Sequence, residues 1–215
     1  DIGLAFDGDA DRLLVIDEKG GLIDGDKIIA ICALDMKRRG QLAKDAAVVT
    51  VMSNMGFFQF CKHNGIQCKT TKVGDRYVLE HMLKHRYSIG GEQSGHIIFS
   101  KHATTGDGIL TSLKVMEVVL EKKQPLDKLA SEVEIYPQVL KNVRVKDKKT
   151  AQDDEAVQAE VARVTRSLGS DGRILLRQSG TEPVVRVMVE APDIQTCETY
   201  VDQVIQVMKD RGHCI

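Results

Sequence analysis

The sequence predicts an α/β protein, in which a domain with a mixed, mainly parallel sheet and helices on both faces is followed by a smaller α+β domain. Short apolar runs alternate with capped amphipathic segments as far as residue 122, which is typical of consecutive βαβ units. After Pro137 the order changes to strand, helix, two strands and helix. With 215 residues, 42% of them hydrophobic, the chain is long enough to form two cores.

In the first half, two apolar runs around a Lys-Gly-Gly turn in residues 13–23 predict a hairpin. A helix should follow, because Asp24 can cap it and apolar residues recur at helical spacing until Gly40. Beyond Gly40 the pattern alternates between apolar runs and capped segments. The expected strands are 46–52, 66–73, 87–91 and 96–100, and the expected helices are 53–64, 75–84 and 104–122.

A domain boundary is expected between residues 122 and 137, where two of the four prolines fall. Beyond it we expect a strand at 139–145, one long helix at 153–168, strands at 173–177 and 184–191, and a final helix at 193–211. The resulting division is 1–23, the end of a preceding α/β domain, then 24–133 and 134–215. The chain starts without methionine and enters an apolar run at once, so we expect residues 2–6 to be a buried strand whose neighbours lie outside this sequence.

Charge and cysteine content exclude several classes of function. The 30 basic and 31 acidic residues give a net charge of −1, which does not favour binding to nucleic acid or to an anionic membrane. No apolar run is long enough to span a membrane, and no secretory leader is recognisable. The five cysteines are odd in number and scattered, which favours a reducing compartment and therefore a cytoplasmic protein.

Three carboxylates at alternate positions, Asp7, Asp9 and Asp11, are the first candidate site. Because close carboxylates repel each other, they favour a hard divalent cation bound through oxygen. A solvated acidic turn is the simpler interpretation. The spacing also imitates a calcium-binding EF-hand with Glu18 at the twelfth place, but Arg12 replaces the required glycine and the flanking segments read as strands.

An apolar strand that ends in Asp-x-Asp is also found in the aspartyl-nucleophile phosphatases of the haloacid dehalogenase class. Ala10 stands where those enzymes place a hydroxyl residue or valine. This phosphatase and a non-enzymatic calcium-binding module therefore remain as alternatives, and the phosphatase would form an aspartyl-phosphate at Asp7.

A second candidate is Gly-Gly-Glu-Gln-Ser-Gly-His at residues 90–96, the histidine loop. Glu92 and Ser94 can bind sugar hydroxyls, and His96 can move a proton. A polar loop with an incidental histidine is the alternative. Lys72 lies at a strand-to-helix turn, where lysine and the helix N-terminus would both favour an anionic ligand.

The third candidate is Arg-Gln-Ser-Gly-Thr-Glu-Pro, which begins at Arg177. Backbone N–H groups of the Ser-Gly-Thr turn (residues 179–181) can form an anion nest, and two arginines lie nearby for contacts with oxygen anions. These features indicate a phosphate cradle, and a hairpin turn with polar decoration is the alternative.

The segments FDGDADR, KVGDRY, GGEQSGH and RQSGTEP, in this order, resemble the α-D-phosphohexomutase family along the whole chain. In that family a serine loop, a metal loop, a sugar-binding loop and a phosphate-binding loop on four domains surround one active site, and the last three have counterparts here. The resemblance implies Mg²⁺ as cofactor. It implies Asp7, Asp9 and Asp11 as metal ligands, Arg12, Lys72 and His96 as catalytic residues, Glu92, Ser94 and His96 as sugar contacts, and Arg177, Ser179, Gly180, Thr181 and Arg186 as contacts of the non-reacting phosphate.

The resemblance further implies an isomerase that moves phosphate between the 6- and 1-hydroxyls of a small phosphosugar, through a bisphosphorylated sugar and an enzyme phosphoserine. Gln93 and the turn at 74–77 favour glucosamine phosphate, and hence UDP-N-acetylglucosamine and cell-wall synthesis, over glucose or mannose phosphates. The complete enzyme is expected to form a homodimer. No serine here lies in the family's T-A-S-H-N-P-like loop, so we expect this chain alone to be inactive. Ala10 replaces a glycine common in the metal loop, which should leave the ligands in place.

Overall fold

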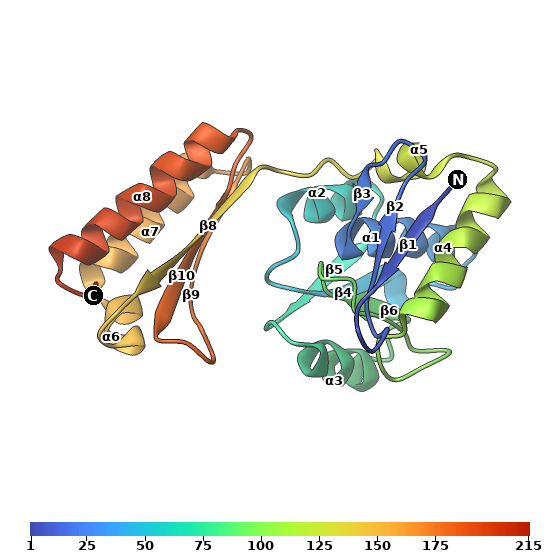
Figure 1. Ribbon diagram of the computed structural model, residues 1–215, viewed down its shortest axis with the longest axis horizontal. Helices are drawn as coiled ribbons and strands as arrows, with labels where there is room; N and C mark the ends of the chain where they lie inside the picture. The colour runs from blue at the N-terminus through green and yellow to red at the C-terminus, as the bar shows by residue number, and fades with distance from the viewer. The chain divides into compact units, whose positions relative to one another are not determined.

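The computed structural model describes residues 1–215 and contains two compact units, Asp1–Ile135 and Tyr136–Ile215 (Figure 1). Each unit has its own hydrophobic core. Residues 1–23, expected to end a preceding domain, lie in the first unit. None of the helices has the length and apolar character that crossing a bilayer requires.

The first unit contains two sheets. A small antiparallel sheet has the order β1-β2-β3, and a four-stranded sheet has the order β5-β4-β6-β7. In the larger sheet β4 pairs in parallel with β5 and β6, whereas β6 pairs antiparallel with β7, which confirms the mixed, mainly parallel sheet. The strands are β1 (Gly3–Phe6), β2 (Leu13–Ile16), β3 (Leu22–Ile23), β4 (Ala46–Thr50), β5 (Gln67–Thr71), β6 (Ile89–Gly91) and β7 (Ile97–Phe99).

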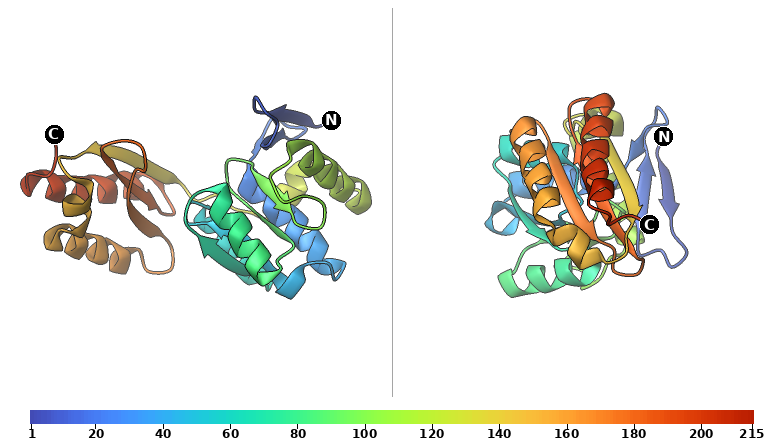
Figure 2. Two further views of the ribbon diagram at one scale, coloured as in Figure 1. Left: turned by 90° about the horizontal axis from the view of Figure 1, so that it is seen from below. Right: turned by 90° about the vertical axis from the view of Figure 1, so that its left-hand side faces the viewer.

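Helices cover both faces of the larger sheet, as predicted (Figure 2). Ala47 and Val49 of β4 belong to the main core together with α1 and α2 residues, whereas Ala46 and Val48 belong to a separate cluster with residues of α3. Adjacent strand residues point to opposite faces, so these two clusters lie on the two sides of the sheet. The helices are α1 (Gly25–Arg38), α2 (Met55–His63), α3 (Asp75–His85), α4 (Gly108–Lys122) and α5 (Leu126–Ala130), and a 3₁₀ turn spans Ala43–Asp45.

The expected helix starts are confirmed by side-chain caps. Asp24 accepts a hydrogen bond from the N–H of Lys27, Asn54 caps α2, and Asp107 caps α4. Each cap satisfies backbone donors that a helix leaves free in its first turn. Since Asp24 and Asp107 also adjoin the candidate site, these caps fix where α1 and α4 begin beside it.

Within this chain β1 is an exposed edge strand, and its expected burial by neighbours outside this sequence stays a prediction. β1 pairs only with β2, and Leu4 and Phe6 are 37% and 42% exposed. An edge strand of a three-stranded sheet has a partner on one side only, so an apolar sequence does not ensure its burial.

The second unit is an antiparallel sheet of order β8-β10-β9 with helices α7 and α8 against it (Figure 1). Its core joins alternate residues of β10 to the apolar face of α8, as predicted. The expected single helix at 153–168 is preceded by a separate short helix, because Asp147 caps residues 148–153 and Asp154 then starts a new helix. The elements are β8 (Gln138–Arg144), α6 (Lys148–Asp153), α7 (Glu155–Leu168), β9 (Arg173–Gln178), β10 (Val184–Glu190) and α8 (Ile194–Asp210).

Candidate functional site

The three aspartates converge in the aspartate loop (residues 7–12), which joins β1 to β2. One ligand oxygen from each of Asp7, Asp9 and Asp11 lies within 4.8 Å of the other two. A turn closed by the N–H of Ala10 on the carbonyl of Asp7, at 3.2 Å, curls the backbone around this point. Ala10 has a φ of 57°, in the left-handed region that favours glycine, which gives a physical reason for glycine at this position.

Arg12 ties the loop together. Its backbone N–H donates to Asp7 Oδ1 at 3.2 Å, and its Nε lies 3.8 Å from Asp7 and 3.9 Å from Asp11. These ion pairs are long, and 49% of the Arg12 side chain is exposed. The guanidinium therefore offsets only part of the repulsion among the aspartates and leaves their oxygens able to bind a cation.

His96 holds Asp11 in place. Its side chain is buried, its Nδ1 lies 3.0 Å from Asp11 Oδ2, and its Nε2 accepts a hydrogen bond from the N–H of Gly106 at 3.0 Å. Because Nε2 accepts, the ring proton is on Nδ1 and is donated to the carboxylate. Both ring nitrogens are therefore engaged. This arrangement describes a positioning residue, and the expected role of His96 in proton transfer remains a prediction.

The histidine loop is docked against the start of β2 and the start of α1. The N–H of Leu13 donates to the carbonyl of Gly95 at 3.1 Å, and the N–H of Gly25 donates to the carbonyl of Gln93 at 2.9 Å. Gly95 has a φ of 95°, and a Cβ there would lie 2.2 Å from the carbonyl oxygen of Leu13. Glycine is therefore required for this approach. Ser94 remains exposed at the tip of the loop.

The turn that carries Lys72 is joined to the histidine loop. Glu92 Oε1 accepts a hydrogen bond from the N–H of Gly74 at 3.0 Å. Lys72 is exposed and has no side-chain hydrogen bond or ion pair. Since β5 ends at Thr71 and β6 at Gly91, both segments leave the carboxyl edge of the parallel strands, where α/β proteins bind ligands.

Asp26 is a buried group that the sequence did not identify as part of this region. It is fully buried, and its Oδ2 accepts a hydrogen bond from the N–H of Asn54 at 2.7 Å. This contact joins the N-termini of α1 and α2. In the sequence Asp26 is indistinguishable from a solvated acidic residue in a first helical turn, so only the packing shows that Asp26 is buried.

In the second unit, Arg177 and Arg186 lie directly opposite each other on β9 and β10. The Nε atoms of both side chains are buried and have no hydrogen-bond partner. Burial, and next the proximity of Arg186, lower the pKa of Arg177 below its ordinary value. Arg186 Nη2 donates to Glu182 Oε2 at 3.4 Å, so Arg186 already has an anionic partner, whereas Arg177 has none and can bind an oxyanion.

The turn beside these arginines is held from two sides. Glu182 donates its N–H to Ser179 Oγ at 3.2 Å, and Lys148 at the start of α6 donates from Nζ to the carbonyl of Ser179 at 2.7 Å. Gly180 and Thr181 remain exposed. Lys148 adds a third cation that the sequence did not suggest, because the unexpected helix α6 brings it here.

The residues of the aspartate loop fit a magnesium ion. The cluster offers three carboxylates, the hard oxygen donors that Mg²⁺ prefers, and two of the three aspartates are exposed. The EF-hand interpretation does not hold, because the loop is flanked by β1 and β2 and Glu18 Oε2 accepts from the N–H of Leu126 instead.

Comparisons with known proteins identify the family. The family described as phosphoglucomutase/phosphomannomutase matches twice, with its alpha/beta/alpha domain III at residues 24–136 and its C-terminal domain at residues 140–207. The chain belongs to this phosphohexomutase family. The family resemblance expected from the four motifs is thereby confirmed, and the aspartyl-phosphate and calcium-module alternatives lose their support.

Two bacterial relatives of this chain are named phosphoglucosamine mutase. The protein from Lachnospira eligens is 59% identical over 215 residues, which is 100% of this chain and 48% of that protein. The protein from Lachnoclostridium phytofermentans is 54% identical over 213 residues, 99% of this chain and 48% of that protein. The chain therefore spans about half the length of the curated relatives that it matches.

Solved structures share the phosphohexomutase fold. The N-acetylphosphoglucosamine mutase of Aspergillus fumigatus, in complex with GlcNAc-6P and magnesium, matches with a TM-score of 0.81 at 23% identity over 99% of this chain and 49% of that one. An N-acetylglucosamine-phosphate mutase in a product complex matches with a TM-score of 0.78 at 24% identity over 96% of this chain and 48% of that one.

Proposed function

We propose that this chain is part of an isomerase that interconverts glucosamine 6-phosphate and glucosamine 1-phosphate with Mg²⁺. Relatives named phosphoglucosamine mutase, at 51–59% identity along nearly the whole chain, support this choice of sugar. In the proposed reaction, phosphate passes between the sugar and an enzyme phosphoserine, through a bisphosphorylated sugar. We assign that serine to the half of the relatives that this chain does not span.

The observation that carries the proposal is the convergence of Asp7, Asp9 and Asp11 within 4.8 Å. These carboxylates would hold the ion, and a bound magnesium ion neutralises the charge that develops on a transferring phosphoryl group. Arg12 brings a half-exposed guanidinium to the same point, where it can contact a phosphate oxygen. His96 keeps the carboxylate of Asp11 in one orientation.

The second unit would hold the phosphate that does not react. The Nε atoms of Arg177 and Arg186 have no hydrogen-bond partner, and the exposed Gly180 and Thr181 offer backbone N–H groups, whereas Arg186 Nη2 already donates to Glu182 Oε2 at 3.4 Å. A phosphate dianion would satisfy these donors and offset the repulsion between the two guanidinium groups.

The sugar ring would lie against the histidine loop. Glu92 and Ser94 can accept from and donate to hydroxyl groups, and the exposed ammonium of Lys72 can contact a phosphate or a hydroxyl. The substrate must be accepted in two orientations in this reaction. A fixed loop that contacts the sugar hydroxyls suits this better than a closed pocket around one end of the sugar.

A phosphoglucomutase or phosphomannomutase is the second candidate, because the matching family carries that description. For the glucosamine enzyme we further propose a cytoplasmic location, in keeping with five free cysteines. We also propose that the complete enzyme is a homodimer that supplies UDP-N-acetylglucosamine and cell-wall synthesis.

Binding to the chain itself tests the proposal. The ¹⁵N-labelled chain is titrated with glucosamine 1-phosphate, glucose 1-phosphate and mannose 1-phosphate in the presence of Mg²⁺, and amide shifts are followed. We expect shifts at the Ser-Gly-Thr turn for all three sugars and stronger binding of the glucosamine compound. Equal binding would favour the second candidate, and absence of shifts at residues 177–186 would refute both.

A further inference from the structure

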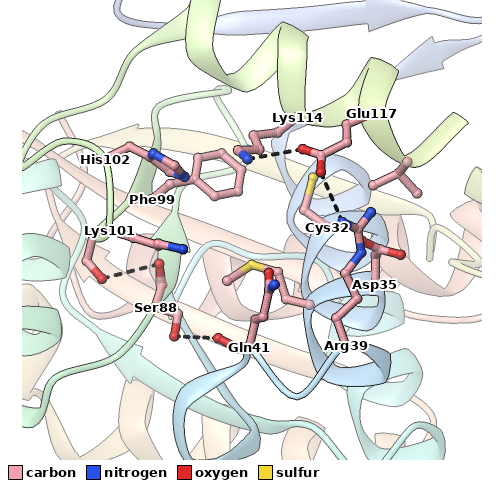
Figure 3. A pocket seen from close by; sticks show the side chains of 13 residues that line it. Cys32, Asp35, Arg39, Gln41, Ser88, Phe99, Lys101, His102, Lys114 and Glu117 are labelled. Carbon is pink, nitrogen blue, oxygen red and sulfur yellow. Dashed lines mark hydrogen bonds and ion pairs between the residues drawn. The ribbon is translucent and has the colours of Figure 1, made fainter. Parts of the chain in front are cut away.

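A cavity of about 360 Å³ lies in the first unit, outside the site described above. It is bounded by the C-terminal half of α1, the end of β7 and the middle of α4 (Figure 3). Its volume is within the range of pockets that bind small organic molecules.

The cavity is at the opposite end of the sheet from the aspartate loop. Gln41 and Ser88 line it, and they precede β4 and β6 at the amino ends of these strands. Helix α1 connects the two regions, since it begins beside Gln93 and ends next to Arg39, which lines the cavity. Its 14 residues rise about 21 Å, so a molecule in the cavity would not occupy the phosphosugar site.

Several charges around the cavity are neutralised within the protein. Arg39 pairs with Asp35 at 2.7 Å and with Glu117 at 3.0 Å, and it also contacts Glu121. Lys114 pairs with Glu117 at 3.0 Å (Figure 3). Lys122 also pairs with Asp35 at 2.7 Å, so three basic side chains balance three carboxylates in this polar wall.

Two basic residues at the rim have no such partner. Lys101 and His102 follow β7, are exposed, and have no side-chain hydrogen bond or ion pair. The apolar part of the cavity wall is formed by the buried Phe99 and Cys32 and by the half-buried Met36. An uncompensated basic rim beside an apolar wall suits an amphipathic anion.

We propose that this cavity binds a small organic oxyanion, a phosphate monoester or a carboxylate with a compact apolar body. The oxyanion is held by Lys101 and His102, and the apolar body lies against Phe99 and Met36. This site is separate from the phosphosugar site and does not depend on the proposed function.

The rim of the cavity is continuous with the segment that supports the aspartate loop. His102 donates its N–H to the carbonyl of Phe99 at 2.8 Å, and four residues later the N–H of Gly106 donates to His96. Gly108 then donates its N–H to the carbonyl of Ala10 at 2.9 Å. A ligand at Lys101 and His102 therefore holds the beginning of the segment whose end contacts His96 and the aspartate loop.

The test is an amide-shift titration of the ¹⁵N-labelled chain with phenyl phosphate, benzoate and the uncharged benzyl alcohol. Phenyl phosphate or benzoate should shift the amides of Lys101 and His102, and the tighter of the two identifies the head group. Benzyl alcohol should bind at least about tenfold more weakly, because it lacks the charged hydrogen bonds.

Three variants locate the site. Lys101→Glu should weaken binding about tenfold or more, and Gln41→Trp should abolish it by filling the cavity from an exposed position. Lys62→Glu, an equal charge change on the exposed side of α2, should leave binding unchanged. The proposal is overturned if neither anion shifts the amides of residues 101 and 102, or if shifts occur only at the Ser-Gly-Thr turn. It is also overturned if Lys101→Glu binds the anions as tightly as the parent, or if benzyl alcohol binds as tightly as the anions.

Discussion

Replacing Arg177 by methionine should weaken phosphate binding without lowering the stability of the ligand-free second unit. The substitution removes the charge but keeps an unbranched apolar stem that can cover the same surface. In the parent chain Arg177 lies directly opposite Arg186, and both Nε atoms are buried without a hydrogen-bond partner. Arg177 has no ion pair within the chain, so its guanidinium is free to bind an anion.

The magnitudes follow from this arrangement. Each hydrogen bond to a charged group contributes about 1.5–3 kcal/mol, so the loss of one such contact with phosphate should weaken binding by roughly 10- to 150-fold. Like charges at opposed strand positions cost about 0.2–1 kcal/mol, and Arg177→Met removes this cost. Without ligand the second unit should thus unfold at the parent's temperature or up to a few degrees higher.

The assay pairs calorimetric titration of glucosamine 1-phosphate with differential scanning calorimetry of the ligand-free chain. Arg166→Met is the matched control, since Arg166 is exposed on α7, and neither property should change. The reasoning is refuted if Arg177→Met binds the sugar phosphate as tightly as the parent, or if it destabilises the ligand-free unit by more than about 1 kcal/mol while Arg166→Met does not.

Further predictions concern the aspartate loop, a helix cap and the isolated chain. Asp9→Asn should greatly weaken Mn²⁺ binding measured by electron paramagnetic resonance, whereas Asp171→Asn, an exposed change in the second unit, should not. His96→Ala should weaken Mn²⁺ binding about 10- to 100-fold. His96→Gln can still donate a hydrogen bond to Asp11 and should bind Mn²⁺ more tightly than His96→Ala. Equal losses of affinity in the two variants would contradict positioning by that hydrogen bond. Hydrogen bonds from His213, the backbone and Arg211 lower the pKa of Asp154 to about 2 from 3.8. The ionised carboxylate therefore stabilises the fold above pH 4, and this stabilisation is lost as the pH falls towards 2. Asp154→Asn should have a lower melting temperature than the parent at pH 7, and the two melting temperatures should converge at pH 2. Finally, the isolated chain should not interconvert glucosamine 6-phosphate and glucosamine 1-phosphate, and measurable turnover in a coupled assay would contradict the assignment of the phosphoserine to another part of the enzyme.

Local signals in the sequence predicted most of the fold. Asp24, Asn54 and Asp107 cap the expected helices, since a cap depends on a few neighbouring residues. The short helix α6 was missed because its cap, Asp147, precedes a polar segment without apolar periodicity. The apolar sequence of β1 predicts burial by segments outside this chain, and within the chain β1 is exposed at the edge of its sheet.

The sequence predicted which residues form the candidate site, but it did not predict the contacts that these residues make. The spacing of the three aspartates indicated convergence, and the structure brings their oxygens within 4.8 Å. No local pattern could show that both nitrogens of His96 are engaged, because one partner is a backbone group in a separate loop. Likewise the opposition of Arg177 and Arg186 follows from strand register, which is a non-local property.

The most direct measurement of the central claim is the activity of a completed enzyme. The upstream half of the Lachnospira eligens relative, which is 59% identical to this chain where the two overlap, is joined to residue 1. The folded chimera should interconvert glucosamine 6-phosphate and glucosamine 1-phosphate when Mg²⁺ is present, and Asp9→Asn should abolish the reaction. A folded chimera without this activity, or one whose activity survives Asp9→Asn, would contradict the account.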